Sequence, residues 1–307
     1  MKILYMGTPD FAARPLKALI EAGHEVCGVV SQPDRPRGRG EKVEPPPCKA
    51  VAVERGIEVF QPESLKGGAF LAVLEKLKPE LIVVAAYGKI LPKYILDFPR
   101  LGCINIHASI LPKYRGAAPI QWAVINGERE TGVSIMYMNE KMDEGDVILV
   151  HKTPISESET SGELFLRLSE MSVGALFEAL LMISENRAPR TPQDGTKATY
   201  APMIGKELGH IDWTKGVRDI FNLIRGVTPA PGAFSLSDGG RVKIIRAVLG
   251  SAKNGAPGEV LEISKDGMFV MCGDGISLCV TELQFENSKK MPAFEYFKGH
   301  ESIRLLW

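Results

Sequence analysis

Short apolar runs alternate with helical segments through residues 2–183, and this alternation limits the possible fold more than any other feature. The run Glu80–Ala86 is apolar along its interior, which is typical of a strand buried on both faces of a sheet. Comparable runs lie at Lys2–Met6, Glu25–Ser31, Ile57–Phe60 and Cys103–His107. Among the helical segments, Gly162–Ile183 is long and amphipathic. The order predicts an α/β domain with a mostly parallel, twisted, Rossmann-like sheet and flanking helices.

The pattern changes after Ile183. Residues 184–202 are polar and proline-bearing, as in a linker. Beyond Gly205, short strands alternate with turns, which predicts a small β-barrel or sandwich. The 307 residues exceed a typical single domain. We therefore expect one domain at residues 1–188, a linker at 189–204 and a second domain at 205–307.

Composition excludes several classes of protein. Lys plus Arg and Asp plus Glu both number 37, so the net charge gives no argument for a nucleic-acid partner. The five cysteines contain no C-x-x-C pair, which argues against a disulfide scaffold and a zinc site. We expect buried thiols, no metal and a reducing cytoplasmic location. No apolar run reaches the roughly 18 residues of a membrane helix, and no segment indicates a protein partner.

Familiar cofactor and hydrolase motifs are missing from the sequence. The first strand runs into Gly7-Thr8-Pro9-Asp10-Phe11 rather than G-x-G-x-x-G, so the dinucleotide fingerprint fails. There is no Walker P-loop, no H-E-x-x-H and no G-x-S-x-G.

Two polar residues share one face of the strand Cys103–His107. Side chains alternate along a strand, so Asn105 and His107 point the same way. Ligands of open α/β sheets bind outside the carboxyl ends of the strands, where this strand places both residues. The alternative is that both side chains only satisfy buried backbone groups.

A turn at Met142–Asp146 separates two more expected strands. Asp143 approaches His107 if these strands lie beside it in the sheet; otherwise it is an ordinary turn residue with Gly145. An Asn, a His and an Asp together suit acyl transfer to an amine, because the amine is itself the nucleophile. The enzyme then needs only to bind the oxyanion and to move protons.

These residues resemble the folate-dependent formyltransferases. The matching pattern is Asn105-x-His107-x-Ser109-x-Leu111-Pro112, with Tyr114-Arg115-Gly116 and Asp143-x-Gly145-Asp146 after it. Further stretches at Met6–Pro9, Gln32–Gly40, Tyr200–Ile204 and Ile211–Trp213 resemble the branch of the family that acts on aminoacyl-tRNA.

The resemblance implies a role for each matching residue. Asn105 stabilises the tetrahedral oxyanion, His107 is a polarised donor or proton carrier, and Asp143 orients His107 and relays protons. The co-substrate is 10-formyltetrahydrofolate, and the acceptor is the methionine on initiator Met-tRNA. The folate is bound by a loop in which Ile110 replaces the family's usual Leu, and Tyr87–Pro92 helps to wall the pterin pocket. The folate-binding loop residues are Ser109, Ile110, Leu111 and Pro112. The C-terminal barrel is implied to be OB-like and to hold tRNA.

The segment Gln32–Pro47 combines arginines with glycines and prolines that deny it regular structure. Clustered arginines suit phosphate contact, although a solvated loop is the alternative. The resemblance implies that this segment enters the acceptor stem of tRNA, with Arg39 as its tRNA-binding residue.

Three other functions stay open. A formyltransferase for a sugar amine or another small amine would use the same three residues. A tRNA- or folate-binding protein without catalysis, and a dehydrogenase, are further alternatives.

Overall fold

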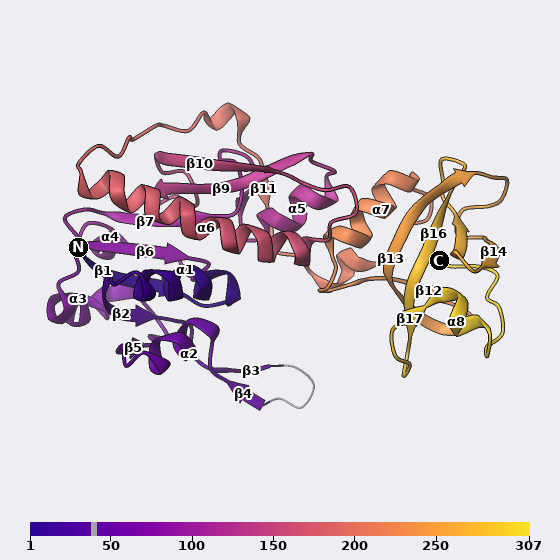
Figure 1. The fold of residues 1–307 in the computed structure, drawn as a ribbon, viewed down its shortest axis with the longest axis horizontal. Coiled ribbons are helices and arrows are strands. Elements are labelled where there is room, and N and C mark those ends of the chain that lie inside the picture. The colour runs from indigo at the N-terminus through magenta and orange to yellow at the C-terminus, as the bar shows by residue number, and fades with distance from the viewer. Residues whose placement is uncertain (38–41) are drawn as a thin grey trace. The chain divides into compact units, whose positions relative to one another are not determined.

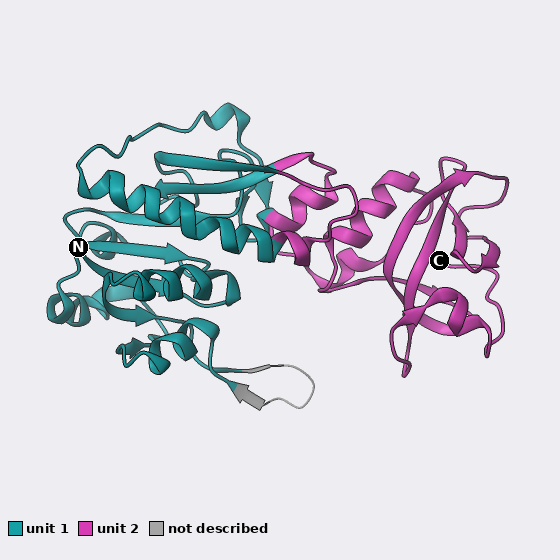
Figure 2. Ribbon diagram, viewed as in Figure 1, with its two compact units in different colours: residues 1–119, 131–153, 165–201 teal, residues 120–130, 154–164, 202–307 magenta. Residues whose placement is uncertain are grey.

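The computed structural model describes residues 1–37 and 42–307, which form two compact units (Figure 2). The first unit takes residues 1–119, 131–153 and 165–201; the second takes 120–130, 154–164 and 202–307. Most of the expected linker thus belongs to the first compact unit. The division at 188 and 205 concerns domains that fold independently, and it stays a prediction.

A seven-stranded sheet, in the order β10-β9-β7-β6-β1-β2-β5, forms the centre of the first unit (Figure 1). Its strands are β1 (Lys2–Gly7), β2 (Glu25–Val30), β5 (Val59–Phe60), β6 (Leu81–Ala85), β7 (Cys103–His107), β9 (Glu130–Tyr137) and β10 (Val147–Pro154). Pairing from β7 to β5 is parallel, whereas β7 and β9 are antiparallel. The mostly parallel sheet is confirmed. The strand order reverses between β1 and β6, the usual place for a ligand.

Helices cover both faces of this sheet because alternate residues of β1 face opposite layers. Tyr5 faces α1 (Asp10–Glu21) and donates its hydroxyl hydrogen to Ala12 O at 2.7 Å. Met6 lies in the opposite hydrophobic cluster, with Leu74 of α3. The other helices of this unit are α2 (Pro47–Glu54), α3 (Leu71–Leu77), α4 (Lys93–Leu96) and most of α6 (Ser161–Ser184), whereas α5 (Pro119–Ile125) lies almost wholly in the second unit.

Two local expectations are wrong. The apolar periodicity of Leu65–Leu77 suggests one helix, but the structure has a short 3₁₀ turn, η1 (Lys66–Gly68), before α3. Gly67 and Gly68 adopt φ of 65° and 77°, which a continuous helix does not allow. The segment after Gln32 is also partly regular, because β3 (Arg35–Arg37) pairs antiparallel with β4 (Lys42–Glu44).

The second unit contains an antiparallel sheet in the order β12-β13-β16-β15-β14, with β17 beside β16. Its strands are β12 (Ala233–Ser237), β13 (Gly240–Ala252), β14 (Val260–Ser264), β15 (Gly267–Met271), β16 (Ile276–Phe285) and β17 (Met291–Pro292). Residues 304–307 hydrogen-bond to both ends of this path: Val260 N donates to Arg304 O at 2.9 Å and Leu236 N to Trp307 O at 2.8 Å. They bridge the end strands, which gives the unit its barrel-like form.

Two helices of the second unit were not expected. In α7 (Val217–Gly226), the buried residues Val217, Ile220, Phe221 and Ile224 form one apolar stripe. This stripe packs into the cluster that also holds Trp213 and strand residues of the barrel. The other helix is α8 (Ala293–Phe297).

The cysteines are all free thiols, and four of the five are buried. Burial raises the pKa of the Cys103 thiol to about 12. In the described part of the chain, no helix combines the length and apolar character of a membrane span.

Candidate active site

Strand β7 carries the first two candidate residues to the carboxyl edge of the sheet. It lies between β6 and β9, and Asn105 is in register with Val84 and Met136. His107 is 5% exposed, and Asn105 is half-buried. The alternation of β7 therefore places an amide and an imidazole together at the strand end, as expected from the sequence.

The turn between β9 and β10 brings the carboxylate of Asp143 to the same place. Asp143 Oδ1 accepts from Asn105 Nδ2 at 3.4 Å, and Oδ2 lies 3.7 Å from His107 Nδ1. The turn is tight: a Cβ on Gly145 would lie 1.7 Å from Tyr137 O. Asp143 itself has a φ of 52°, a left-handed conformation that costs free energy outside glycine.

The neighbours of His107 restrict where its ring hydrogens lie. Nε2 is 2.9 Å from Tyr114 O, and a carbonyl oxygen only accepts, so Nε2 carries a hydrogen. Nδ1 then faces the Asp143 carboxylate.

The loop after β7 is held by hydroxyl contacts. Ser109 Oγ donates to Lys113 O at 2.6 Å, and Ser134 Oγ donates to Ser109 O at 2.6 Å. Leu111 N donates to Ser134 Oγ at 3.1 Å. Ser109 and Leu111 are buried, whereas Ile110 and Pro112 are half-buried. The two half-buried residues are therefore the better placed of the four to meet a ligand; folate binding by this loop stays a prediction.

Two residues without an expected site role also reach this cluster. Arg115 is 3% exposed and pairs with Glu144, Nη1 to Oε1, at 3.2 Å. Gln193 lies in the expected linker, yet its side chain contacts both Arg115 and the Asp143 turn. The Tyr114-Arg115-Gly116 motif was a signal for Arg115. Nothing in the local sequence indicates Gln193.

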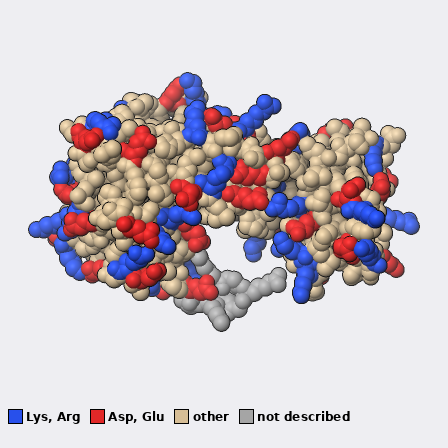
Figure 3. All heavy atoms as spheres, in the orientation of Figure 1, with Lys and Arg blue, Asp and Glu red and all other residues tan. Residues whose placement is uncertain are grey.

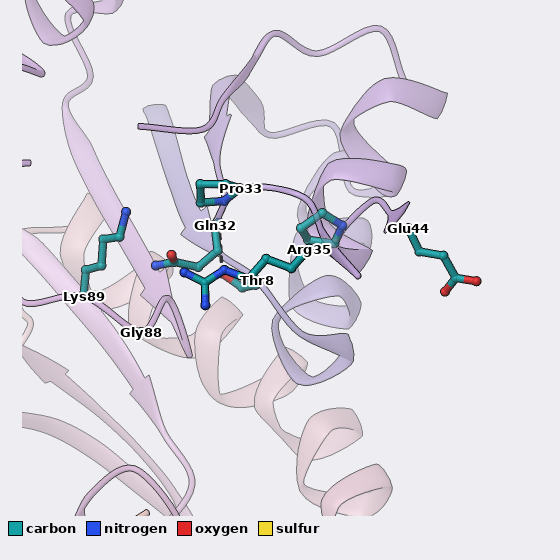
Figure 4. Close-up of a pocket in the computed structure, with 8 residues that line it drawn as sticks. Thr8, Gln32, Pro33, Arg35, Glu44, Gly88 and Lys89 are labelled. Carbon is teal, nitrogen blue, oxygen red and sulfur yellow. Dashed lines mark hydrogen bonds between the residues drawn. The ribbon is translucent and has the colours of Figure 1, made fainter. Parts of the chain in front are cut away.

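A cavity of 410 Å³ lies at the same edge of the sheet, near the ends of β1, β2 and β6 (Figure 4). Gly88 and Lys89, from the stretch expected to wall a pterin pocket, line it. The other lining residues are Thr8, Gln32, Pro33, Arg35, Glu44 and Pro46. Gln32 Nε2 donates to Tyr87 O at 2.9 Å and joins β2 to the β6 loop. Figure 4 shows the Arg35 and Gln32 side chains beside Thr8, with Glu44 pointing away.

Arg39 lies outside the described residues. On the face drawn in Figure 3, Lys and Arg are intermixed with Asp and Glu, without a broad basic surface. Within residues 1–37 and 42–307, no group of three or more His, Cys, Asp or Glu is arranged to hold a metal ion.

Comparison with known families accounts for both parts of the chain. The formyl transferase family matches residues 1–180, and the formyl transferase C-terminal domain matches residues 203–301. The chain belongs to the formyl transferase family. This assignment confirms the resemblance drawn from the motifs around Asn105 and Asp143.

Relatives within the family match the chain over nearly its whole length. A methionyl-tRNA formyltransferase of Moorella thermoacetica is 48% identical over 99% of this chain and 97% of its own. One of Syntrophus aciditrophicus is 46% identical over 98% of this chain and 96% of its own. Among solved structures, an N-formyltransferase of Helicobacter canadensis in complex with folinic acid and dTDP-3-aminofucose has a TM-score of 0.69 at 19% identity. It covers 95% of this chain and 100% of its own, and it supports the fold.

Proposed function

We propose that this protein transfers the formyl group of 10-formyltetrahydrofolate to the α-amino group of methionine on initiator Met-tRNA. The cluster of Asn105, His107 and Asp143 in a formyl transferase unit carries this proposal. The relatives named methionyl-tRNA formyltransferase match both family domains, which favours tRNA over a sugar amine as the acceptor. The reaction belongs to translation initiation, and we place it in the cytoplasm.

The cluster supplies what the transfer needs. The amine nitrogen attacks the formyl carbon, a tetrahedral oxyanion forms, and the bond from that carbon to the folate nitrogen then breaks. Asn105 Nδ2 donates a hydrogen bond to the oxyanion. His107, held by its Nε2 hydrogen to Tyr114 O, presents Nδ1 to the reacting groups as a polarised donor or proton carrier.

Protons must also move, because the attacking amine loses one and the leaving folate nitrogen gains one. Asp143 contacts both Asn105 and His107, and it takes the amine proton, directly or through one water. Gly116 N donates to Asp143 Oδ2 at 2.8 Å, which fixes the carboxylate for this task.

Folate and tRNA occupy different surfaces in this proposal. The volume of the cavity near Thr8 and Lys89 lies within the range of small-molecule sites, roughly 300–1,000 Å³. Ser109, Ile110, Leu111 and Pro112 form the folate-binding loop. Arg39 contacts a tRNA phosphate, and residues 205–307 act as a tRNA-binding domain that follows a catalytic domain of residues 1–188 in the sequence.

The test offers labelled 10-formyltetrahydrofolate together with Met-tRNA and a dTDP-amino sugar. We expect label on Met-tRNA only; label on the sugar only would overturn the choice of acceptor. Arg39→Ala should weaken tRNA binding and flatten its salt dependence by about 0.7–0.9 log units per log unit of salt. Arg39→Lys should restore binding only in part, since an ammonium lacks the planar fork of a guanidinium. Unchanged affinity and slope would remove Arg39 from the tRNA site.

A further inference from the structure

Gln193 connects the stretch after α6 to the turn that carries Asp143. Its amide nitrogen, Nε2, donates to two backbone carbonyl oxygens of that turn, Asp143 O and Gly145 O, each at 2.8 Å. Its amide oxygen, Oε1, accepts from Arg115 Nε at 3.1 Å and from Arg115 Nη2 at 2.9 Å. One half-buried side chain thus makes four hydrogen bonds to two segments of the candidate active site.

The segment around Gln193 also holds the other side of the Asp143 carboxylate. Strand β11 (Tyr200–Ala201) pairs in parallel with β8 (Arg115–Gly116), and Gly116 N is the donor to Asp143 Oδ2. Gly116 has a φ of 116°, and a Cβ there would lie 2.8 Å from Ala201 O. Gln193 therefore supports the main chain of Asp143, and β11 supports the group that binds its side chain.

The Asp143 turn requires such support. Its left-handed residue and the close approach of Gly145 to Tyr137 O give it a conformation that persists only when surrounding contacts enforce it. A carboxylate that moves by an ångström relative to His107 loses most of its value in proton transfer.

We propose that Gln193 is a positioning residue that fixes Asp143 against Asn105 and His107 through its two donated hydrogen bonds. The proposal rests on the proposed function, because it assigns Gln193 a role in formyl transfer. It also gives one residue of the expected linker a positioning role in the candidate active site. The role requires a hydrogen-bond donor at this position, because Asp143 O and Gly145 O are both acceptors. The amide nitrogen of Gln193 supplies both hydrogens.

A matched pair of variants separates donation to the turn from the contact with Arg115. Gln193→Glu keeps an acceptor for Arg115 but puts a carboxylate oxygen against the two turn carbonyl oxygens. Gln193→Ala removes both contacts. We expect both variants to lose about tenfold to a hundredfold in kcat on Met-tRNA, with KM for either substrate little changed. Lys197→Ala, which removes an exposed ion pair with Asp194 from the same segment, is the control and should keep the parent kcat.

The pH profile gives a readout that a merely structural role would not move. The carboxyl group introduced by Gln193→Glu regains a donor when it is protonated, so the kcat of this variant relative to Gln193→Ala should rise as the pH falls. Parent-like kcat in Gln193→Glu at neutral pH would show that only the Arg115 contact matters and would overturn the proposal. Parent-like kcat in Gln193→Ala would overturn it as well.

Hydrogen exchange tests the same idea without formyl transfer. Peptides that cover residues 138–147 should exchange faster in both Gln193 variants and at the parent rate in Lys197→Ala. If the parent protein formylates another amine instead of Met-tRNA, the proposed function fails, and the variants are compared on that amine. Unchanged exchange in both Gln193 variants would overturn the positioning role whatever the acceptor is.

Discussion

The two compact units bury polar side chains in different ways. In the second unit, Trp213 Nε1 donates to Ser235 Oγ at 2.9 Å, and Ser235 Oγ donates to Trp307 O at 3.0 Å. In the first unit, Asn105 and Asp143 meet only at 3.4 Å, at a strand end beside a turn with a left-handed residue. These two short hydrogen bonds pair the buried Trp213 and Ser235 side chains and stabilise the fold. The longer contact between Asn105 and Asp143 leaves the amide donor of Asn105 available for a reacting group.

The largest expected effect tests the role of the long contact in the first unit. Asn105→Ala removes an oxyanion donor and should lower kcat by about 10²–10³ with the melting temperature nearly unchanged. Asp143→Asn should be similarly damaging in steady-state assays, whereas Asp146→Asn in the same turn should be tolerated. Near-normal turnover in Asn105→Ala, or greater harm from Asp146→Asn, would show that the cluster is assigned wrongly.

The second prediction tests the stabilising role of the short contacts in the second unit. Ser235→Ala leaves the buried Trp213 Nε1 without its acceptor and should cost about 1–3 kcal/mol in the free energy of unfolding. Denaturant unfolding measures this loss, and kcat at a permissive temperature should stay at the parent value. Ser264→Ala removes a half-buried hydroxyl of β14 whose hydrogen bond, from Asp266 N, is exposed to water, and should change stability by no more than about 0.5 kcal/mol. A fall in kcat for Ser235→Ala with unchanged stability would break the distinction between the units.

The smallest effect concerns a polar group that is bound tightly but remains largely in water. Glu163 forms a capping box with Thr160 at the start of α6: Thr160 N donates to Glu163 Oε2 at 2.8 Å. This bond, together with those from Arg246 and the Thr160 hydroxyl, lowers the pKa of Glu163 to about 2. Because the folded pKa lies below the ordinary value of 4.5, the stabilisation is complete above that value and is lost as the pH falls towards 2.

Glu163→Gln should therefore be less stable than the parent at neutral pH, by about 0.5–1 kcal/mol, because water and salt screen this half-exposed carboxylate. The difference should shrink through the window from 4.5 to about 2. Thermal unfolding across this range measures it. A difference that does not change with pH would mean that the charge of Glu163 contributes nothing.

Local pattern was sufficient for some of these features and not for others. The alternation along Cys103–His107 puts Asn105 and His107 on one face without reference to the rest of the fold. The approach of Asp143 depends on β9 pairing with β7, which local pattern does not specify. Gln193 was missed because its partners, Arg115 and the Asp143 turn, lie about 78 and 50 positions away.

The missed helix has a different cause. The apolar stripe from Val217 to Ile224 has clear helical spacing, but the stretch beyond Gly205 was interpreted as short strands between turns, without a helix. The same kind of signal misled at Leu65–Leu77, where the spacing was helical but Gly67 and Gly68 interrupt the chain. Apolar spacing can favour a helix where a glycine favours a turn, and the packing of the folded chain determines which of the two forms.

The Trp213–Ser235–Trp307 chain has a consequence for spectroscopy. The protein has three tryptophans, Trp122, Trp213 and Trp307, and all of them lie in the second unit. Intrinsic tryptophan emission therefore reports mainly on the second unit. It reports little on the first unit, which holds Asn105, His107 and Asp143. A fluorescence melting curve would follow one half of the molecule, and an optical probe of the catalytic half requires an indole introduced near β7.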